Sequence, residues 1–282
     1  MCYVNIGLKY FAKRSPKNFV RIIHPLSFIF LLGMTAFFFG HQMFYIAPQL
    51  YGGVLYKICW IVAIFITYNI LGNMLACYHT NSSVESLPKD RQVPTPGDEH
   101  TWIYCKTCQK LMPPRSWHCD LCRCCILKRD HHCIFTGTCI GHNNHRYFFW
   151  LTFYLTLGLI GCIGSHFLHA IIHGFHLISF LGLDLINMIF QHNGPEPSLY
   201  YKPVFGLCLL LCCLPGIMLA WQIQILCTNS DYYNFYSQVY DLGLKKNCKI
   251  MLGERGLWTF LSPSVKSPLP HDGTQWQMKH SV

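Results

Sequence analysis

Residues 105–139 read CKTCQKLMPPRSWHCDLCRCCILKRDHHCIFTGTC, a segment dense in cysteine and histidine. A pair such as Cys105-x2-Cys108, followed about ten residues later by histidine or cysteine, has the spacing of zinc ligands. Eight residues fit this use, and they are Cys105, Cys108, His118, Cys119, Cys122, Cys125, His132 and Cys139. A structural zinc takes four such ligands, so the segment predicts two Cys3His sites and two structural Zn²⁺ ions. The spacing alone does not say which ligand binds which ion.

Two cysteines of the segment fall outside this ligand set. Cys124 adjoins a ligand, and it is either inert or a competitor for the metal. Cys133 follows Asp130, His131 and the ligand His132. A free thiol with a pKa of about 8.5 is only roughly 3% thiolate at pH 7, so a nucleophilic cysteine needs a nearby base. A spare thiol beside a histidine on a metal-bound scaffold is therefore typical of a cysteine nucleophile.

A disulfide framework is the alternative use for so many cysteines. It is disfavoured because histidines occupy ligand positions in the segment. It is also disfavoured because the topology predicted below places the segment in the cytosol, where thiols stay reduced. The sequence therefore favours metal binding over disulfide bonds.

The rest of the chain has the composition of a membrane protein. Of its 282 residues, 52% are hydrophobic and only 12% are charged. A membrane-spanning helix needs about 20 apolar residues, and four stretches are long enough, namely 25–47, 54–77, 147–172 and 203–226. Basic residues precede the first stretch and it has no strong cleavage site, so we expect a retained helix and not a signal peptide.

Lysine and arginine residues predict the orientation of the four spans. They number five before the first span, none in loop 48–53, nine in loop 78–146, one in loop 173–202 and six after residue 226. This alternation follows the positive-inside rule, so both termini and the cysteine-rich loop are expected in the cytosol. The net charge of +10 follows from this asymmetry and suits anionic lipid headgroups. No basic soluble domain is present to indicate a nucleic-acid partner.

The predicted fold class is an all-α membrane protein with four transmembrane helices and a small cytosolic zinc-binding domain between helices 2 and 3. The expected parts are an N-terminal tail (1–24), helices 1 and 2 (25–77), a linker with the cysteine-rich domain (78–146), helices 3 and 4 with a lumenal loop (147–226), and a C-terminal tail (227–282). Segment 173–200 is expected to be an interfacial helix or a partly re-entrant loop. Prolines and a glycine predict a loose end from about residue 262. No internal repeat is apparent.

The cysteine-rich segment resembles the DHHC-type protein S-acyltransferases, the palmitoyltransferases. The resemblance rests on about fifty residues of high specificity. In chain order they are Cys105-x2-Cys108, Pro114, Arg115, His118-Cys119-x2-Cys122-x2-Cys125, Asp130-His131-His132-Cys133 and Cys139-Ile140-Gly141-x2-Asn144-x3-Phe148. The four-span topology, with this segment between spans two and three, extends the resemblance more loosely over the chain.

The resemblance implies a ligand assignment and a reaction. One zinc is bound by Cys105, Cys108, His118 and Cys125, and the other by Cys119, Cys122, His132 and Cys139. Cys133 is then the acyl-accepting nucleophile, His131 its general base, and Asp130 the residue that orients His131, as in other acyl-transfer triads. The implied reaction moves a long-chain acyl group, palmitoyl, from acyl-CoA to Cys133 and then to cysteines of target proteins.

The implied partners are palmitoyl-CoA, the lipid bilayer, and cytosolic or membrane-bound proteins with juxtamembrane cysteines. We expect endomembranes, the ER or Golgi, more than the plasma membrane. The active site is expected at the cytosolic membrane face, because the acyl chain needs an apolar slot while CoA stays in water. Lys128, Arg129 and Arg115 are candidates for binding the phosphates of CoA. Solvated or lipid-facing cations are the alternative reading of these three residues.

Some positions depart from the family pattern. Phe135 replaces a tryptophan, Thr138 replaces an asparagine, and Thr228-Asn-Ser-Asp231 matches only weakly the Thr-Thr-x-Glu motif after span four. Asn247 resembles the family's C-terminal structural asparagine. The departures motivate one alternative, a zinc-domain scaffold or adaptor that has lost activity. Cross-braced zinc motivates another, a membrane-anchored RING-like ubiquitin ligase, which has no need of a spare Cys133. Only an assay separates an acyltransferase from the inactive scaffold.

Overall fold

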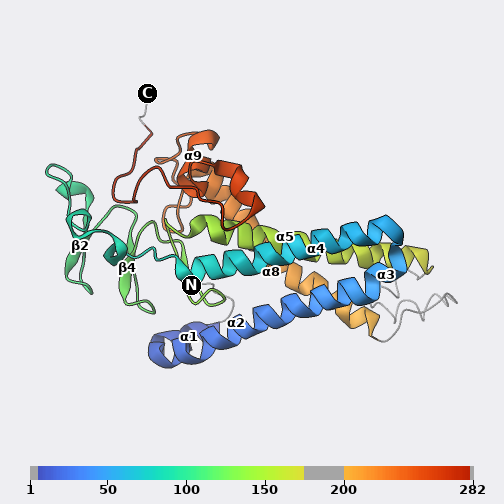
Figure 1. The fold of residues 1–282 in the computed structure, drawn as a ribbon. Helices are drawn as coiled ribbons and strands as arrows, with labels where there is room; N and C mark the ends of the chain where they lie inside the picture. The colour runs from blue at the N-terminus through green and yellow to red at the C-terminus, as the bar shows by residue number, and fades with distance from the viewer. Residues whose placement is uncertain (1–5, 175–199, 280–282) are drawn as a thin grey trace. The chain divides into compact units, whose positions relative to one another are not determined.

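The computed structural model of the protein describes residues 6–174 and 200–279 (Figure 1). These residues form two compact units. The first unit contains the described parts of 1–32, 71–151 and 220–282, and the second contains those of 33–70 and 152–219. The first unit thus gathers both tails and the cysteine-rich segment, as expected if they share one side of the membrane. The interfacial helix or re-entrant loop expected in 173–200 falls almost entirely outside the described residues.

Four helical stretches have the length and composition to cross a membrane. The first, Pro16–Leu50, combines α2 (Pro16–Gly40), a π-helical turn η1 (His41–Ile46) and α3 (Ala47–Leu50). The others are α4 (Gly53–His79), α5 (His145–Ile172) and α8 (Tyr201–Thr228). Apolar runs of this length form helices because a helix satisfies its backbone polar groups within one segment. The prediction of an all-α membrane protein with four spans is confirmed for a mostly helical fold, whose cysteine-rich segment contains short β-strands.

The first of these helices begins earlier than expected. α2 starts at Pro16, and a further helix, α1 (Ile6–Arg14), precedes it within the expected N-terminal tail. Proline suits the first helical position, where its missing N–H would have no partner. Phe11 of α1 packs against Phe19 of α2, with ring centroids 5.9 Å apart. Hydropathy did not register these turns, because they carry the basic residues of the tail.

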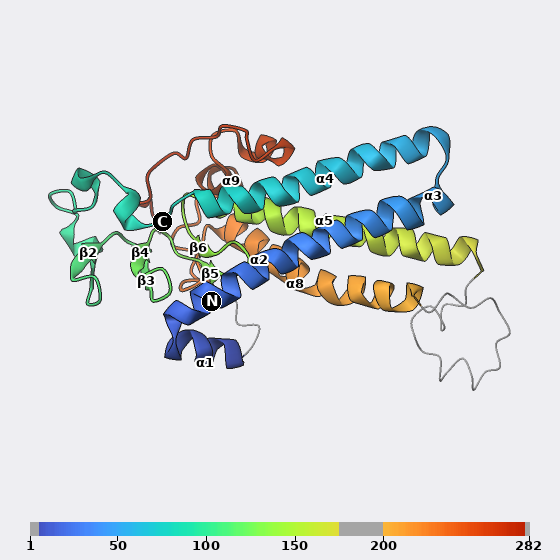
Figure 2. The ribbon, with the colours of Figure 1, turned by 60° about the horizontal axis from the view of Figure 1, so that its bottom comes forward.

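Between α4 and α5 the chain forms three antiparallel β-hairpins (Figure 2). They pair β1 (Ile103–Cys105) with β2 (Lys110–Met112), β3 (Trp117–Cys119) with β4 (Cys124–Ile126), and β5 (His131–Cys133) with β6 (Thr138–Ile140). Each strand has three residues, too few for a sequence periodicity to predict. An isolated two-stranded hairpin is at best marginally stable in water, so other constraints must hold these hairpins in place.

The three hairpins repeat one another at a step of fourteen residues. The first strands end at Cys105, Cys119 and Cys133, and each of these residues pairs with the first residue of its second strand. The turn residues, also fourteen apart, are Gln109, Arg123 and Gly137, with φ of 54°, 58° and 66°. The expectation of no internal repeat is therefore wrong. The residues that the hairpins share are mainly the repeated cysteines and histidines, which were interpreted as zinc-ligand spacing and not as a repeat.

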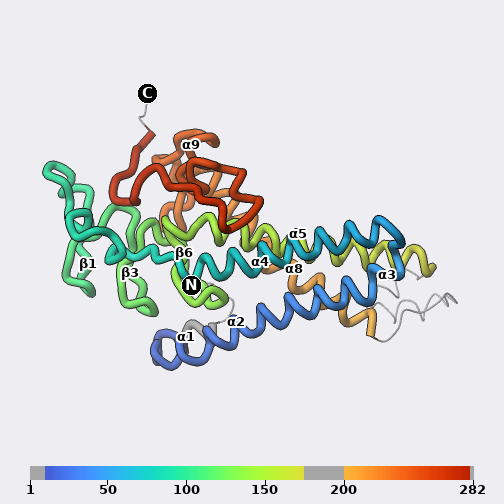
Figure 3. The backbone as a smooth tube through the Cα atoms, viewed as in Figure 1, coloured from blue at the N-terminus to red at the C-terminus, as the bar shows by residue number. Residues whose placement is uncertain are grey.

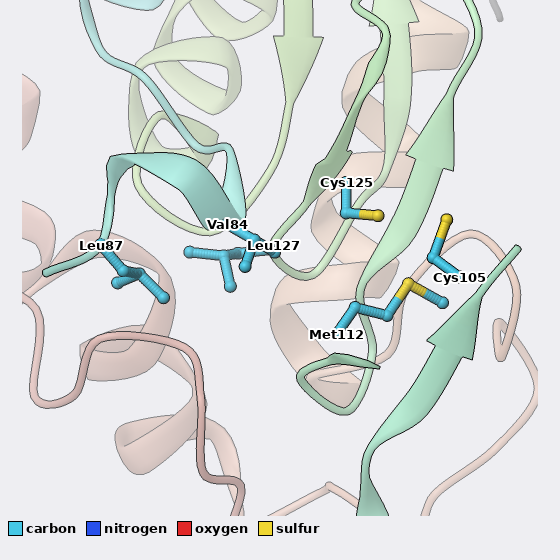
Figure 4. Packing of buried hydrophobic residues seen from close by; sticks show 6 residues of the cluster. All are labelled: Val84, Leu87, Cys105, Met112, Cys125 and Leu127. Atoms are coloured by element: carbon cyan, nitrogen blue, oxygen red, sulfur yellow. The ribbon is translucent and has the colours of Figure 1, made fainter. Parts of the chain in front are cut away.

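The linker before the hairpins packs on them. Its short 3-10 turns are η2 (Val84–Ser86), η3 (Lys89–Arg91) and η4 (Glu99–Thr101). A buried cluster joins the linker to the hairpins and comprises Val84, Leu87, Cys105, Met112, Cys125 and Leu127 (Figure 4). The backbone N–H of Leu127 also donates to the carbonyl of Ser82 at 2.9 Å. The segment expected to be a polar linker is therefore a structural part of the cysteine-rich domain.

The C-terminal tail folds back within the same unit, as the red trace in Figure 3 shows. It contains α9 (Leu244–Leu252) and a 3-10 helix η5 (Gly256–Leu261). Asn247 of α9 caps the end of α8, because its Nδ2 donates to the carbonyl of Cys227 at 2.7 Å. Asp272 forms an ion pair of 2.8 Å with Arg91 of the linker. The expectation of a loose end from residue 262 is thus wrong for the described residues up to 279.

The second unit consists of the remaining parts of the spans. One of its buried clusters comprises Phe38, Cys162, Val204 and Cys208. The Nε2 atoms of His41 and His166 lie 2.9 Å apart, with their rings stacked. Among the described residues these two histidines do not belong to a group of three or more metal ligands. We therefore read them as a polar contact that satisfies two buried rings.

Candidate functional site

The first metal-binding group joins the first two hairpins. Cys105 ends β1 and Cys108 lies in the turn that follows, whereas His118 and Cys125 lie on β3 and β4. Cys108 Sγ is 3.2 Å from His118 Nδ1 and 3.7 Å from Cys125 Sγ. The four ligand atoms lie within 4.8 Å of one another, so they can bind a single ion.

The second group joins the second and third hairpins in the same way. Its residues are Cys119, Cys122, His132 and Cys139. His132 Nδ1 lies 3.2 Å from Cys122 Sγ and 3.6 Å from the Sγ atoms of both Cys119 and Cys139. The Sγ atoms of Cys122 and Cys139 are 3.6 Å apart. All four residues are buried or partly buried.

Both groups fit the dimensions of a tetrahedral zinc site. With Zn–S of about 2.3 Å and Zn–N of about 2.0 Å, such an ion holds two sulfurs about 3.8 Å apart and a sulfur and a nitrogen about 3.5 Å apart. The Sγ–Sγ distances given above are 3.6 and 3.7 Å, and the Sγ–Nδ1 distances lie between 3.2 and 3.6 Å. The structure thus brings together the two ligand sets that the family resemblance implies. Cys124 belongs to neither group.

One rule describes both groups. Each takes the two cysteines of one hairpin and then a histidine and a cysteine of the next hairpin. In the second hairpin His118 pairs with Cys125 across the strands, and in the third His132 pairs with Cys139 at the same register. Each ion would therefore bind successive hairpins together, which is the constraint that three-residue strands cannot supply.

The same rule accounts for the spare thiol. Cys133 occupies the place in the third hairpin that the first metal-binding cysteine occupies in the other two. No fourth hairpin follows to supply a histidine and a cysteine, because α5 begins at His145. Thr136 stands where the second cysteine of a Cys-x2-Cys pair would be. The third hairpin thus gives His132 and Cys139 to the second group, whereas Cys133 belongs to neither group.

Cys133 lies beside the histidine and the aspartate that precede it. His131 Nδ1 is 3.1 Å from Asp130 Oδ2. His131 and Thr136 lie close enough to the Cys133 thiol for both to lower its pKa. These four side chains are buried, and the ring of Phe148 from α5 packs edge-on against His131 at 4.7 Å. The three residues predicted as nucleophile, base and orienting carboxylate therefore share one small buried site.

The electrostatics of the site favour the ionised forms of its acidic groups. Burial raises the pKa of the Cys133 thiol. Hydrogen bonding with His131, the attraction of that ring, and the hydroxyl and N–H of Thr136 lower this pKa by more than burial raises it, so the net shift is downward. Burial likewise raises the pKa of Asp130. The charge and hydrogen bond of His131, with smaller contributions from His145 and Gln222, outweigh it and hold that pKa well below its usual range. Asp130 is therefore a buried anion compensated by its neighbours.

Sequence reasoning missed two residues that surround Asp130. Gln222 of α8 donates from Nε2 to Asp130 Oδ2 at 2.8 Å. His145, the first residue of α5, lies 2.6 Å through its Nε2 from Gln222 Oε1. Both side chains are buried. A usable signal existed for Gln222, since a polar side chain in a membrane span is costly unless it has a partner.

A third missed residue lies behind the second metal group. His24 of α2 approaches His132 with the two Nε2 atoms 3.0 Å apart and the rings stacked at 5.0 Å. Because the Nδ1 of His132 faces the thiols, its Nε2 is the atom that an outer partner can orient. Such partners fix the tautomer and the ring plane of a metal-binding histidine. No spacing in the sequence connects His24 with residue 132.

Asn144 ties the hairpins to the end of α4. Its Nδ2 donates to the carbonyls of Cys139 at 2.9 Å, Thr80 at 3.2 Å and Cys77 at 3.3 Å. Its Oδ1 accepts from the hydroxyl of Ser82 at 3.1 Å and from the N–H of Gly141 at 2.8 Å. The side chain is fully buried. This position belongs to the motif quoted above, and its role here is to hold three segments of the backbone together.

Arg115 lies in a buried polar cluster of the first unit. Its Nε is 2.9 Å from Asp231 Oδ2, and both side chains are only 1% exposed. Its Nη2 donates to the carbonyl of Asn229 at 2.6 Å. The guanidinium also lies 4.3 Å from the ring centroids of Tyr240 and Trp276. The weakly matched motif after span four therefore supplies Asp231 as the partner of a buried cation.

Lys128 belongs to the same cluster, whereas Arg129 reaches its edge. Lys128 Nζ donates to Asn229 Oδ1 at 2.7 Å, and burial and repulsion by Arg115 lower the pKa of this lysine. Arg129 is partly exposed and donates to the hydroxyl of Tyr233. The structure thus uses Lys128 and Arg115 inside the protein, which differs from their expected contact with CoA phosphates. Arg129 is the one of the three with an exposed part.

The fold and this site define a membrane protein that holds a cysteine, histidine and aspartate group on a cysteine-rich scaffold. The DHHC palmitoyltransferase family matches residues 98–239. The chain is 28% identical over 228 residues to the probable palmitoyltransferase ZDHHC24 of Danio rerio, covering 78% of this chain and 76% of that protein. It is 30% identical over 220 residues to the probable palmitoyltransferase ZDHHC24 of Rattus norvegicus, covering 76% of each.

The chain therefore belongs to the DHHC palmitoyltransferase family. The resemblance found in the sequence is confirmed, and the activity is that of a protein-cysteine S-palmitoyltransferase. The RING-like ubiquitin ligase is not supported by these findings.

Completing the third Cys-x2-Cys pair should turn the enzyme into one that zinc inhibits. In Thr136→Cys the new thiol takes the place that Cys108 and Cys122 hold in the other hairpins, so it can share a metal ion with Cys133. We expect added micromolar zinc to lower self-acylation of this variant several-fold and to leave the parent protein unchanged. Incorporation of labelled palmitate measures this, with Thr136→Ser as control. Equal zinc response in all three proteins would contradict the structural equivalence of the hairpins.

Removing one partner of the buried ion pair should destabilise the protein strongly. Asp231→Ala leaves the Arg115 cation buried without its anion, which costs about 3–5 kcal/mol. Thermal unfolding of the detergent-solubilised protein, followed by intrinsic fluorescence, should show a large fall in Tm. The control is Glu85→Ala, which removes the exposed ion pair of 3.0 Å with Lys110 and should cost less than about 1 kcal/mol. A similar Tm for both variants would show that the buried pair is not needed for stability.

Proposed function

We propose that the protein uses Cys133 as the nucleophile that takes a palmitoyl group from palmitoyl-CoA and passes it to cysteines of target proteins. The observation that carries this proposal is that Asp130, His131 and Cys133 lie together in one buried site while Cys133 belongs to neither metal-binding group. A hairpin that only binds structural metal does not need a thiol that binds no metal. An acyltransferase, by contrast, needs a free thiol beside a base.

The first step forms the acyl-enzyme. With its proton on Nδ1, His131 donates to Asp130 and presents Nε2 as a base, which takes the proton of the Cys133 thiol. The thiolate attacks the carbonyl carbon of the donor thioester, the bond from that carbon to the sulfur of CoA breaks, and the CoA thiolate leaves with the proton from His131. Asp130 stabilises the imidazolium that exists between the two proton transfers.

The second step reverses the roles of the two thiols. A cysteine of the target protein gives its proton to His131 and attacks the acyl carbon. The bond to Cys133 Sγ breaks, and Cys133 recovers the proton. One thioester replaces another in each step, so neither step requires an oxidant or a second nucleotide.

We propose that both metal-binding groups hold structural zinc. The donor sets are three thiolates and one imidazole each, which is the ligand chemistry of closed zinc sites. Such an ion supplies folding energy because the ligands are not assembled in the unfolded chain. The residues of the reaction site itself are outside both ligand sets.

The proposed orientation puts the reaction site at the cytosolic membrane face of an endomembrane, the ER or Golgi. The alternation of basic residues supports this orientation, and the enclosure of both tails and the hairpins within one unit is consistent with it. There CoA would stay in water while the acyl chain enters the apolar region, and target cysteines close to a membrane would reach the same thiol. Partly exposed Arg129 remains the candidate contact for CoA phosphates.

Replacing the nucleophile should abolish self-acylation without unfolding the protein. Cys133→Ser keeps the shape of the side chain, but an imidazole does not activate a serine hydroxyl in this setting at neutral pH. We expect the hydroxylamine-sensitive label from palmitoyl-CoA to fall to background in this variant. Cys124→Ser, in the same domain but outside both metal groups, should label like the parent protein. A label that persists undiminished in Cys133→Ser would place the chemistry on another cysteine.

Elemental analysis should find about two zinc ions per chain. Cys105→Ala and Cys119→Ala remove one ligand from the first and the second group, so each should lose about one ion together with solubility. Cys124→Ala should keep both ions and serves as the control. Full zinc loading of both ligand variants would contradict the ligand assignment.

A further inference from the structure

We propose that Gln222 of span α8 is a positioning residue for acyl transfer, because it fixes the carboxylate of Asp130 and, through it, the orientation of His131. The inference rests on the proposed roles of Asp130, His131 and Cys133. It adds a residue of a membrane span to a site that is otherwise built from one hairpin. This residue lies seventy-seven positions beyond the start of α5.

The geometry places Gln222 in direct contact with the carboxylate that orients the base. Oδ2 of Asp130 accepts two hydrogen bonds, one from His131 at 3.1 Å and one from Gln222 Nε2 at 2.8 Å. The Gln222 side chain is fully buried, and the side chain of Asp130 is 2% exposed. Water therefore does not compete for this oxygen, and the carboxylate rotamer depends on these two donors.

The Asp130 carboxylate can only accept, so it decides which end of the Gln222 amide faces it, and His145 lies at the other end. The Nε2 of His145 lies 2.6 Å from Gln222 Oε1, and 3.8 Å from Asp130 Oδ2. If the amide were turned over, its oxygen would face the carboxylate oxygen at 2.8 Å, and its NH2 group would face the ring nitrogen that donates. With the amide as it stands, His145 donates to Gln222, Gln222 donates to Asp130, and His131 donates to Asp130. The hydrogen bonds of His131 and Gln222 are thus both directed at the Asp130 carboxylate, and that of His145 supports Gln222.

This arrangement has a consequence for the reaction. A carboxylate with only one neighbour can turn about its side-chain bonds and release His131 from the position in which Nε2 faces the thiol. The second donor removes that freedom before the acyl-CoA binds, which is how a supporting residue preorganises a base. Because Gln222 and His145 come from two different spans, the positions of α8 and α5 set the orientation of the base on the hairpin.

Three variants separate this role from simple packing. Gln222→Met keeps the length of the side chain and removes its donor and acceptor. Gln222→Glu keeps the shape and the acceptor but removes the donor toward Asp130. Gln224→Met makes the same chemical change as the first variant at an exposed position on the same helix, two residues further on. The purified full-length proteins are mixed with labelled palmitoyl-CoA, and the single-turnover rate of labelling at Cys133 is measured over a range of donor concentrations.

We expect both Gln222 variants to slow self-acylation about 10-fold to 100-fold, the effect of losing a hydrogen bond to a charged group. The half-saturating concentration of palmitoyl-CoA should stay within about two-fold, since Gln222 contacts no substrate in this scheme. Zinc content should stay at the parent value, and Gln224→Met should behave like the parent protein. An unchanged rate in Gln222→Met, or a parent-like rate in the isosteric Gln222→Glu, would overturn the proposal.

A double-variant comparison tests whether Gln222 acts through Asp130. In the Asp130→Asn background, adding Gln222→Met should change the residual labelling rate by less than about two-fold, because residues of one network are not additive. A further loss as large as in the parent protein would show that Gln222 acts independently, and the proposal would fail. Persistent labelling in Cys133→Ser would instead overturn the proposed nucleophile, so the two failures can be told apart.

Discussion

Each metal-binding group of this protein takes ligands from two successive hairpins, and the cysteine-rich domain depends on that constraint. Strands of three residues cannot hold a sheet together, so the order of the hairpins is set by which histidine and cysteine close each four-ligand group. The series stops when the chain enters α5. The last hairpin therefore retains the backbone that places a cysteine sulfur beside the N–H groups of its turn, but it has no further ligands. The thiol that we propose as the nucleophile thus lies where the series of hairpins ends.

The histidine that we propose as the base contacts a buried anion, Asp130, whose charge is compensated by its neighbours. Asp130 accepts hydrogen bonds from His131 and Gln222, and the cations Arg115 and Lys128 are in turn held by Asp231 and Asn229. Removing charges from water is favourable only where such partners are complete. The segment that follows α8 provides two of these partners, so the C-terminal tail takes part in the buried polar packing around Arg115 and Lys128.

Local patterns of apolar residues predicted the four spans, and ligand spacing predicted the eight candidate ligands and the spare thiol at 133. The division of the ligands into two sets was implied only by the family resemblance. The hairpin repeat was missed, because its shared cysteines and histidines were interpreted as ligand spacing and its strands have only three residues each. Sequence reasoning also missed His24, His145 and Gln222, whose contacts with the site join segments far apart in the chain. The loose end expected from residue 262 failed for a related reason. Composition shows that the segment contains proline and glycine. It does not show that Asp272 forms an ion pair with Arg91 or that the Trp276 ring packs on Arg115.

The departures from the family pattern motivated the reading of the chain as an inactive scaffold, and their positions argue against it. Phe135 and Thr138 lie in and beside the turn of the third hairpin, where both are partly exposed, and neither belongs to a metal-binding group. Asp231, in the weakly matched motif, forms a fully buried ion pair with Arg115. A chain that had lost its reaction would have no reason to keep Asp130 as a buried anion with two donors, since a buried charge is costly wherever it is not used. The presence of this buried charge at Asp130 despite its free-energy cost, together with family membership, favours an active acyltransferase.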